Sequence, residues 1–426
     1  SRLPSAEDPQ FGLPIASSFI VAGATSSIDL HDPSGLHAGD AEPVRIYSTD
    51  GSIVSGQGSG LGAMILDLPK PGLLAAGLDI VDLSLRGQHL YAGDVTRILA
   101  GRDIYNTPLA PQRSVAFIEI GGPGTLMLQA GRDIGPLTSA NDALALGYLR
   151  PVGAQYPGIR TVGNQNNVWL PREGASILLA FGTAPGQALD AFAAKYIDPA
   201  VLHDPLDPTD TLGTPDYGDA LLAFIRQLEA DRAAREGVDF APSAIDRTAA
   251  WEIFGTLPEP QRLLFAYGVL LDILDRTGLD YNDPDSRFAQ QYARGFEAID
   301  TLFPASLGYT LNTRDGTPPS VVPTGTLDMR GSTIQTQRGG DILVLGPGGD
   351  VVVGSTSAPP LVPASAFTAG IGPNNQGILV LEQGRIRMFT DQSVLLAQSR
   401  IFTEQGGDLL IWSSNGDINA GKGAKT

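Results

Sequence analysis

The sequence contains no cysteine among its 426 residues. Disulfides, thiolate catalysis and cysteine-ligated zinc or iron–sulfur clusters are therefore excluded. Positive charge is also scarce, because 28 Lys and Arg face 46 Asp and Glu and the formal net charge is −18. This charge disfavours nucleic acid or an anionic membrane surface as a partner, since like charges repel. No apolar run approaches the ~20 residues that span a bilayer, so we expect no direct membrane insertion.

What the chain does have is an ordinary hydrophobic content of 42% and an unusually large number of glycines, 52. The hydrophobic content indicates a folded protein, and the length suggests two or three domains. An acidic, cysteine-free, glycine-rich chain is typical of an exported bacterial protein. Ser1 is not an initiator Met and the last residues are glycine-rich, so we expect a piece of a longer protein.

The composition changes sharply along the chain. Residues 187–307 hold only 7 of the 52 glycines, and they carry 21 acidic against 9 basic residues. The sequence on both sides reads as short apolar segments separated by Gly, Asn, Asp and Pro, which is typical of strands and turns. Residues 78–85 (LDIVDLSL) alternate apolar and polar side chains, which predicts one half-buried strand.

A short unit, Gly-x-Asp-Ile or a close variant, recurs in these strand-rich parts. It occurs at Asp79, Asp103, Asp133 and Asp417, and as Gly-Asp-Val at Asp350. We expect the glycine to adopt a positive φ at a corner, the aspartate to accept backbone N–H bonds there, and the following Ile to enter the core. A recurring unit of 24 to 30 residues is typical of a solenoid, and stacked units of this kind predict a parallel β-helix.

Residues 187–307 instead show helical spacing. Apolar residues recur three and four positions apart in 189–196, 219–236, 245–257 and 259–277, and Gly237 and Gly278 are expected to end two of these helices. A fifth helix is expected from residue 283, with Phe288, Tyr292 and Phe296 on one face. We therefore predict three parts: a β-solenoid over 1–186, an acidic α-helical insert over 187–307, and a second β-solenoid part over 308–426.

Three segments carry a family resemblance. Residues 130–135 (AGRDIG), 170–177 (LPREGASI) and above all 407–426 (GDLLIWSSNGDINAGKGAKT) resemble the C-terminal region of filamentous-haemagglutinin-like exoproteins. These are large bacterial adhesins exported by two-partner secretion. The resemblance implies a right-handed β-helix, an outer-membrane secretion partner, and a secreted or cell-surface location. It implies a role in adhesion, biofilm or cell–cell contact, and it supplies no catalytic residue.

Several residue groups offer other chemistry. The recurrent aspartates could form a glycoside-cleaving pair, although turn capping explains their fixed place after glycine. Asp204, Asp207 and Asp210 crowd a Pro-rich stretch and are weak candidates for calcium, without the spacing of an EF-hand. The four histidines, His31, His37, His89 and His203, show no metal-binding spacing. Residues 416–422 match a phosphate-loop pattern but lack the required Ser or Thr that follows. Trp251 is expected in the core of the helical bundle.

The prediction is therefore a mainly β protein, a parallel β-helix interrupted by a helical bundle. Its predicted function is a non-enzymatic structural or adhesive segment without a cofactor. The insert is expected either to contact a cell-surface receptor or glycan or to shield an end or edge of the solenoid. One alternative is a carbohydrate-active β-helix enzyme that uses paired carboxylates. The other is a terminal cap or anchoring segment of a secreted filament.

Overall fold

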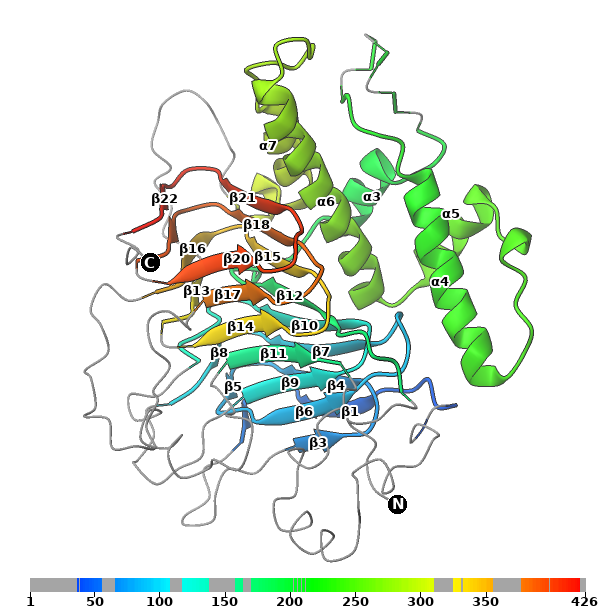
Figure 1. Cartoon of the computed structure of the whole chain (residues 1–426), viewed down its shortest axis with the longest axis vertical. Helices are drawn as coiled ribbons and strands as arrows, with labels where there is room; N and C mark the ends of the chain where they lie inside the picture. The colour runs from blue at the N-terminus through cyan, green and yellow to red at the C-terminus, as the bar shows by residue number, and fades with distance from the viewer. Residues whose placement is uncertain are drawn as a thin grey trace, which may run out of the picture. The chain divides into compact units, whose positions relative to one another are not determined.

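The computed structural model describes residues 37, 39–55, 66–107, 117–137, 158–163, 170–201, 203–204, 206–207, 209–210, 212–309, 325–330, 332–354, 377–397 and 399–421. The chain divides into two compact units (Figure 1). The sheet unit is Ser1–Ala184 together with Pro323–Thr426, and the helical unit is Pro185–Val322. The boundaries expected from composition were residues 187 and 307.

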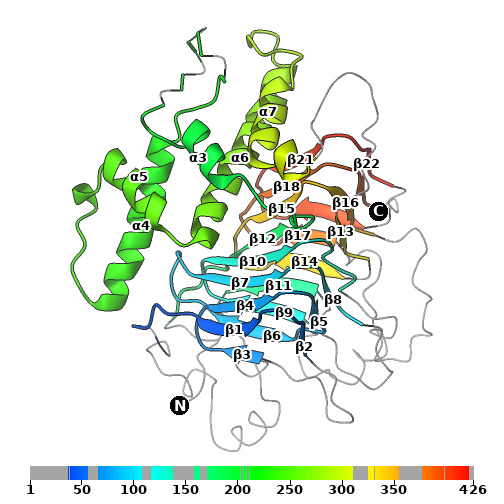
Figure 2. The same cartoon turned by 180° about the vertical axis from the view of Figure 1, so that it is seen from behind.

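The sheet unit is mainly β, and all of its paired strands are parallel (Figures 1 and 2). Sheet A has eight strands in the order β1 (Val44–Ser48), β4 (Gly72–Ala76), β7 (Val95–Ala100), β10 (Thr125–Ala130), β12 (Ser176–Ala180), β15 (Ile342–Gly346), β18 (Ile386–Thr390) and β21 (Leu409–Ser413). Sheet C has seven strands in the order β3 (Leu66–Leu68), β6 (Leu85–Gln88), β9 (Phe117–Gly121), β11 (Gly158–Val162), β14 (Thr333–Thr336), β17 (Gly377–Val380) and β20 (Arg400–Thr403).

The third array, sheet B, has very short strands. Its first part is β2 (Ile53–Val54), β5 (Ile80–Val81) and β8 (Ile104–Tyr105), and its second part is β13 (Gly325–Asp328), β16 (Gly349–Val352), β19 (Val394–Leu395) and β22 (Ile418–Asn419). Ile134 forms parallel bridges to Ile104 on one side and to Leu327 on the other. These bridges join the two parts of sheet B into one array.

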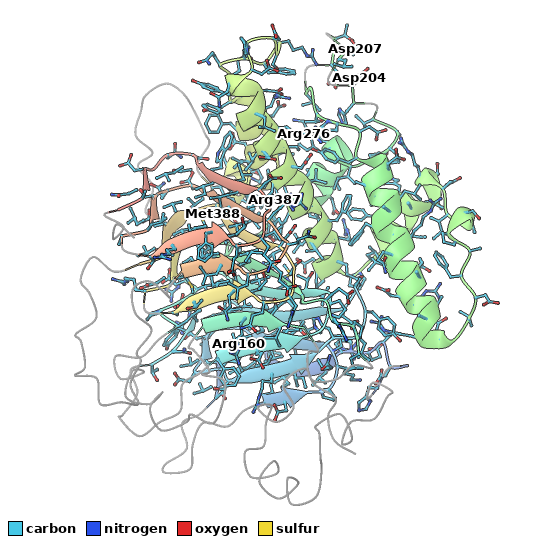
Figure 3. All side chains as sticks on the ribbon, viewed as in Figure 1. Arg160, Asp204, Asp207, Arg276, Arg387 and Met388 are labelled. Carbon is cyan, nitrogen blue, oxygen red and sulfur yellow. The ribbon has the colours of Figure 1, made fainter. Side chains whose placement is uncertain are left out.

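The chain visits the three sheets in the same order, A, then B, then C, in every circuit. Strands of successive circuits lie next to each other, so equivalent side chains stack in register. In sheet A, Ile98 pairs with Leu128, Leu128 with Leu179, and Val344 with Met388, which Figure 3 labels. These inward side chains form one buried apolar cluster that draws on all three sheets. Burial of this cluster is the main stabilising contribution of the sheet unit.

The sheet unit continues directly across the helical insertion. Strand β12 pairs with β15, β11 pairs with β14, and Ile134 bridges to Leu327. The insertion replaces one connection from sheet A to sheet B, which we call a corner. Two residues of the sheet unit that flank the insertion, Gly182 and Gly325, lie side by side, because a Cβ added to Gly325 would lie 2.9 Å from the backbone N of Gly182.

The helical unit contains five α-helices and two short 3₁₀ helices among its described residues. They are α3 (Leu189–Tyr196), α4 (Gly218–Glu236), η2 (Pro242–Ala244), α5 (Arg247–Thr256), α6 (Glu259–Asn282), α7 (Ala293–Leu302) and η3 (Ala305–Leu307). Helices α3, α6 and α7 pack on one another, and α4 packs on α5. Gly237 ends α4 with φ 66°, as the sequence predicts, and Asp246 caps α5 by accepting the N–H of Ala249.

Two helix predictions are wrong. Helix α6 continues through Gly278 to Asn282, because an isolated glycine costs a helix only about 1 kcal/mol relative to alanine and does not by itself end it. The expected helix from residue 283 does not form, and α7 begins only at Ala293. The connection folds back on itself: the Tyr281 and Tyr292 rings stack with centroids 4.1 Å apart, and the Arg294 guanidinium lies 3.8 Å from the centroid of the Phe288 ring.

The single strand expected over residues 78–85 is also wrong. This segment contains β5 and only the first residue of β6, and the two strands belong to different sheets. Between them the chain bends at Asp82, which has a positive φ of 55°. The Asp82 carboxylate holds this bend by accepting the backbone N–H and the hydroxyl of Thr107, at 2.7 and 2.6 Å. An alternating sequence pattern cannot reveal such a bend, because the residues before Asp82 and those after it are buried alike.

Candidate functional site

The recurrent aspartates stack in a column at the corners between sheets A and B. The Asp79 carboxylate accepts the backbone N–H of Asp103 at 3.3 Å, and Asp103 accepts that of Asp133 at 3.1 Å. Asp133 accepts the N–H of Thr326 at 2.7 Å. Each carboxylate therefore binds the N–H of the next circuit, rather than capping its own turn. The column ties successive circuits together.

Two of these carboxylates also bind an arginine of the next circuit. Arg102 binds Asp79 in a bidentate manner, with N–O distances of 3.0 and 2.5 Å. Arg132 binds Asp103 in the same way, at 3.1 and 2.5 Å. The hydrogen bond to Asp79 raises the pKa of the Arg102 guanidinium above its ordinary value. Carboxylates that are held by an arginine and a backbone N–H are poorly suited to act as a general acid or a nucleophile.

Asp133, the third member of the column, is half-buried and has no arginine within hydrogen-bonding distance in the part of the chain that the structure describes. Burial raises the pKa of its carboxyl above the ordinary value of 3.8, and the N–H bond from Thr326 acts in the opposite direction. Asp350 continues the column by accepting the N–H of Ser393 at 2.7 Å. Asp417 is exposed, and its own N–H donates to the Ser393 hydroxyl at 3.2 Å.

The glycines of the repeated unit have a different role from the expected one. Gly77, Gly101 and Gly131 do not adopt a positive φ. A Cβ on Gly101 would lie 2.2 Å from the carbonyl O of Gly77, and a Cβ on Gly131 would lie 2.1 Å from that of Gly101. Glycine is required here because the backbones of neighbouring circuits approach too closely for any side chain. Ile80, Ile104 and Ile134 do enter the core and are buried, whereas Ile418 is 52% exposed.

The loop that contains the calcium candidates uses its carboxylates locally. Asp204 accepts the N–H of Leu206 at 2.8 Å, Asp207 accepts the N–H and hydroxyl of Thr209, and Asp210 accepts the N–H of Leu212. Figure 3 shows Asp204 and Asp207 on this loop of the helical unit. No group of three or more His, Asp or Glu side chains that could hold a metal occurs in the described part of the chain. Calcium binding here remains a prediction.

The histidines lie at separate places. His31 is outside the described residues. His89 is buried, with its ring nitrogens 2.7 Å from the Thr96 hydroxyl and 2.8 Å from the Pro123 carbonyl O. His203 lies 2.8 Å from the Lys195 carbonyl O. The phosphate-loop match also lacks its structural context, because β22 and not a helix follows Asp417 and Lys422 is outside the described residues.

A buried row of alternating charges crosses sheet C. Strand register places Asp67 beside Arg86, Arg86 beside Glu119, and Glu119 beside Arg160. Arg160 pairs with Glu119, and Arg86 Nε lies 3.2 Å from Asp67 Oδ1. Glu119 and Arg86 are 0% and 1% exposed (Arg160 is labelled in Figure 3). Burial raises the pKa of Asp67, Arg86 lowers it and Glu119 raises it.

Sequence reasoning missed this row, although the sequence carries a signal for it. Each of three charged residues stands inside a short strand: Arg86 follows Leu85, Glu119 separates Ile118 from Ile120, and Arg160 follows Ile159. Only the strand register reveals that opposite charges meet.

The helical unit has an open groove of about 460 Å³. Its lining comes from α3 (Asp190, Ala193), α5 (Trp251, Glu252, Phe254, Gly255) and α6 (Arg262). Phe254 is buried, but Trp251 is only half-buried and lines the groove. Trp251 was expected in the bundle core, but part of its side chain lies at the surface of the groove. The volume lies in the range of small-ligand sites.

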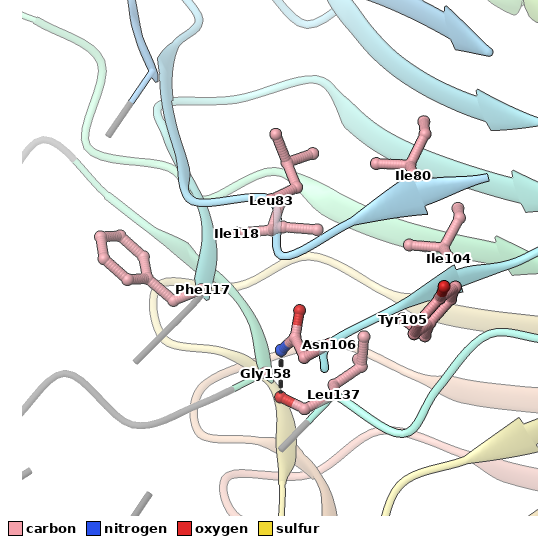
Figure 4. Close-up of a pocket in the computed structure, with 9 residues that line it drawn as sticks. All are labelled: Ile80, Leu83, Ile104, Tyr105, Asn106, Phe117, Ile118, Leu137 and Gly158. Carbon is pink, nitrogen blue, oxygen red and sulfur yellow. Dashed lines mark hydrogen bonds between the residues drawn. The ribbon is translucent and has the colours of Figure 1, made fainter. Parts of the chain in front are cut away.

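A second cavity lies within the sheet unit and is lined by Ile80, Leu83, Ile104, Tyr105, Asn106, Phe117, Ile118, Leu137 and Gly158 (Figure 4). Its volume is about 10 Å³. Asn106 Nδ2 donates to the Leu137 carbonyl at 2.5 Å at its wall. This is room for about one water molecule, so the cavity cannot hold a substrate.

Comparisons of the chain with protein-family models, curated proteins and solved structures returned no match. The resemblance to filamentous-haemagglutinin-like exoproteins accordingly stays a prediction. Within the described residues, no helix combines the length and apolarity needed to cross a membrane.

Proposed function

We propose that the chain is a non-enzymatic structural and adhesive segment of a large secreted bacterial surface protein. In this proposal the sheet unit is a right-handed parallel β-helix, and the helical unit is a module inserted at one of its corners. The parent protein reaches the cell surface through an outer-membrane secretion partner. The helical unit then contacts a receptor or glycan on another cell.

One observation carries the proposal: the strand pairing is uninterrupted across the insertion. Ile177 pairs with Ile342, and the two strands belong to one continuous sheet. Such a scaffold is complete without the insert, so the additional residues are available for another task. Binding residues are commonly found on segments that a rigid scaffold positions.

The aspartate column supports a structural role over the carbohydrate-active alternative. A glycosidase needs two carboxyl groups with access to substrate, one of them able to give up a proton. Asp79 and Asp103 instead bind Arg102 and Arg132 and the backbone of the next circuit.

No described feature favours the terminal-cap alternative either. Capping repeats turn a polar face outward. The last described strands carry apolar side chains that are about half exposed, Leu409 at 50% and Ile418 at 52%.

The test is binding of the purified chain to bacterial and host cell surfaces, with and without residues 185–322. Binding that disappears with the insert, while the β signal in circular dichroism persists, supports the proposal. The same preparations are incubated with a panel of polysaccharides. Release of reducing ends that Asp79→Asn and Asp103→Asn both abolish would replace the proposal with the enzymatic alternative.

A further inference from the structure

The groove of the helical unit is lined by two aromatic and three charged side chains. Trp251 and Phe254 stack with ring centroids 5.8 Å apart and an interplanar angle of 17°. Asp190, Glu252 and Arg262 supply the charges. Gly255 leaves space, because a Cβ added there would meet no atom within 4 Å.

One part of this groove already accommodates a cation from the chain itself. The Arg262 guanidinium carbon lies 5.7 Å from the centroid of the Phe254 ring. The same guanidinium pairs with the Asp190 carboxylate. An aromatic face and a carboxylate together therefore hold a guanidinium here, which is the geometry of a cation–π site with a counter-ion.

Two adjacent residues of α5, Trp251 and Glu252, also line this groove. Trp251 is half-buried and contributes surface to the groove, and the next residue, Glu252, is exposed. Glu252 makes no hydrogen bond or ion pair with any residue in the described part of the chain. Trp is the strongest cation–π partner among the aromatic side chains.

The net negative charge of the surrounding sequence also favours a cationic ligand. Residues 187–307 carry 21 acidic and 9 basic side chains. The resulting field attracts cations to the helical unit and repels anions. A neutral ligand would gain nothing from this excess.

We propose that this groove binds a lysine or arginine side chain from a basic segment of a partner protein, with the cation over Trp251 and beside Glu252. This inference rests on the proposed contact role of the helical unit, because it names the chemistry of the partner.

The test uses the whole chain and an N-acetylated tetra-arginine amide as the probe, titrated by isothermal calorimetry at low and at physiological salt. The control probe is the matching tetra-citrulline peptide, which keeps the shape and lacks the charge. We expect the arginine peptide to bind and the citrulline peptide not to bind. Trp251→Leu should weaken binding by about 3- to 30-fold. Trp251→Phe, which keeps an aromatic face, should retain most of the affinity.

Glu252→Gln should weaken binding and reduce its dependence on salt. The matched control is Asp239→Asn, which removes the same charge from an exposed residue outside the groove. Circular dichroism and thermal unfolding verify that each variant is folded. Equal effects of Glu252→Gln and Asp239→Asn would overturn the proposal, because the peptide would then bind the acidic surface in general.

Absence of peptide binding, or equal binding of the citrulline peptide, also overturns it. So does competition by cellobiose, which would assign the groove to a saccharide. Peptide binding without cell-surface binding would instead contradict the proposed function and leave the cation site intact. The two proposals can therefore fail separately.

Discussion

The Asp133 carboxylate accepts the backbone N–H of Thr326 at 2.7 Å, although 193 residues separate them in the chain. The helical unit lies between these residues in the sequence, yet they occupy neighbouring circuits of the sheet unit. An insertion placed at a corner leaves the strand pairing on both sides unchanged. The strand pairs on both sides of the insertion are therefore formed by residues of the sheet unit alone.

The first prediction follows from this continuity. Replacement of residues 185–322 by a short Gly-Ser linker should leave a folded sheet unit, because Gly182 and Gly325 are already in contact. Circular dichroism should show a β signal, and urea should unfold the protein cooperatively. The matched control also removes Ser176–Ala180, which deletes β12 and separates β10 from β15. An aggregated first variant, or a folded control, would contradict the prediction.

The second prediction concerns the pH dependence of Asp133. Its pKa is raised in the folded state by burial, so its favourable contribution is present below the ordinary value of 3.8 and is lost as pH rises through the folded pKa. Asp133→Asn cannot ionise, and its amide oxygen can still accept the Thr326 N–H. We expect this variant to gain stability relative to the wild type as pH increases from 3 to 7.

The measurement is the free energy of unfolding in urea at several pH values for both proteins. Asp133→Ala is the control, because it lacks the acceptor and should be less stable than Asp133→Asn at every pH by about 1–3 kcal/mol. If the free energies of unfolding of Asp133→Asn and the wild type differ by the same amount at every pH, burial does not raise the pKa of this carboxyl.

The third prediction tests the close approach of circuits at the corners. Gly101→Ala places a methyl group 2.2 Å from the Gly77 carbonyl O, so neighbouring circuits must separate. We expect a loss of about 3 kcal/mol in the free energy of unfolding. Gly268→Ala, in α6 with no atom within 4 Å of the added Cβ, is the control and should stabilise the protein by up to about 1 kcal/mol. Equal small effects of both changes would rule out the steric explanation.

Features that depend on a few adjacent residues could be predicted from the sequence. The burial of Ile104 and the end of α4 at Gly237 are examples, because local pattern and backbone chemistry decide them. Features that depend on neighbouring circuits could not. The requirement for Gly101 comes from a carbonyl 24 residues away, and Asp103 binds the N–H of Asp133 rather than its own turn. The half-exposed Trp251 likewise depends on how α3, α5 and α6 pack.

The last prediction concerns the buried charges of sheet C. Glu119→Gln removes the carboxylate that pairs with the Arg160 guanidinium, in a site where Glu119 is 0% exposed. Removal of one partner of a buried pair costs about 3–5 kcal/mol, because the remaining charge stays desolvated. The free energy of unfolding in urea should fall by this amount. The effect should change little with added salt, since buried pairs are poorly screened.

The double variant Glu119→Leu with Arg160→Met distinguishes two quantities. One is the cost of removing a single charge of the pair, and the other is the stability that the intact pair contributes. It removes both charges and keeps apolar volume, so it should recover most of the stability that Glu119→Gln loses. Arg86, which lies beside Glu119 in register and pairs with Asp67, keeps its own counter-ion in this variant. If the double variant is as unstable as Glu119→Gln, the pair contributes stability of its own. If it is stable but populates several conformations by NMR, the charges act by fixing the register of β9 and β11, because only one alignment brings opposite charges together.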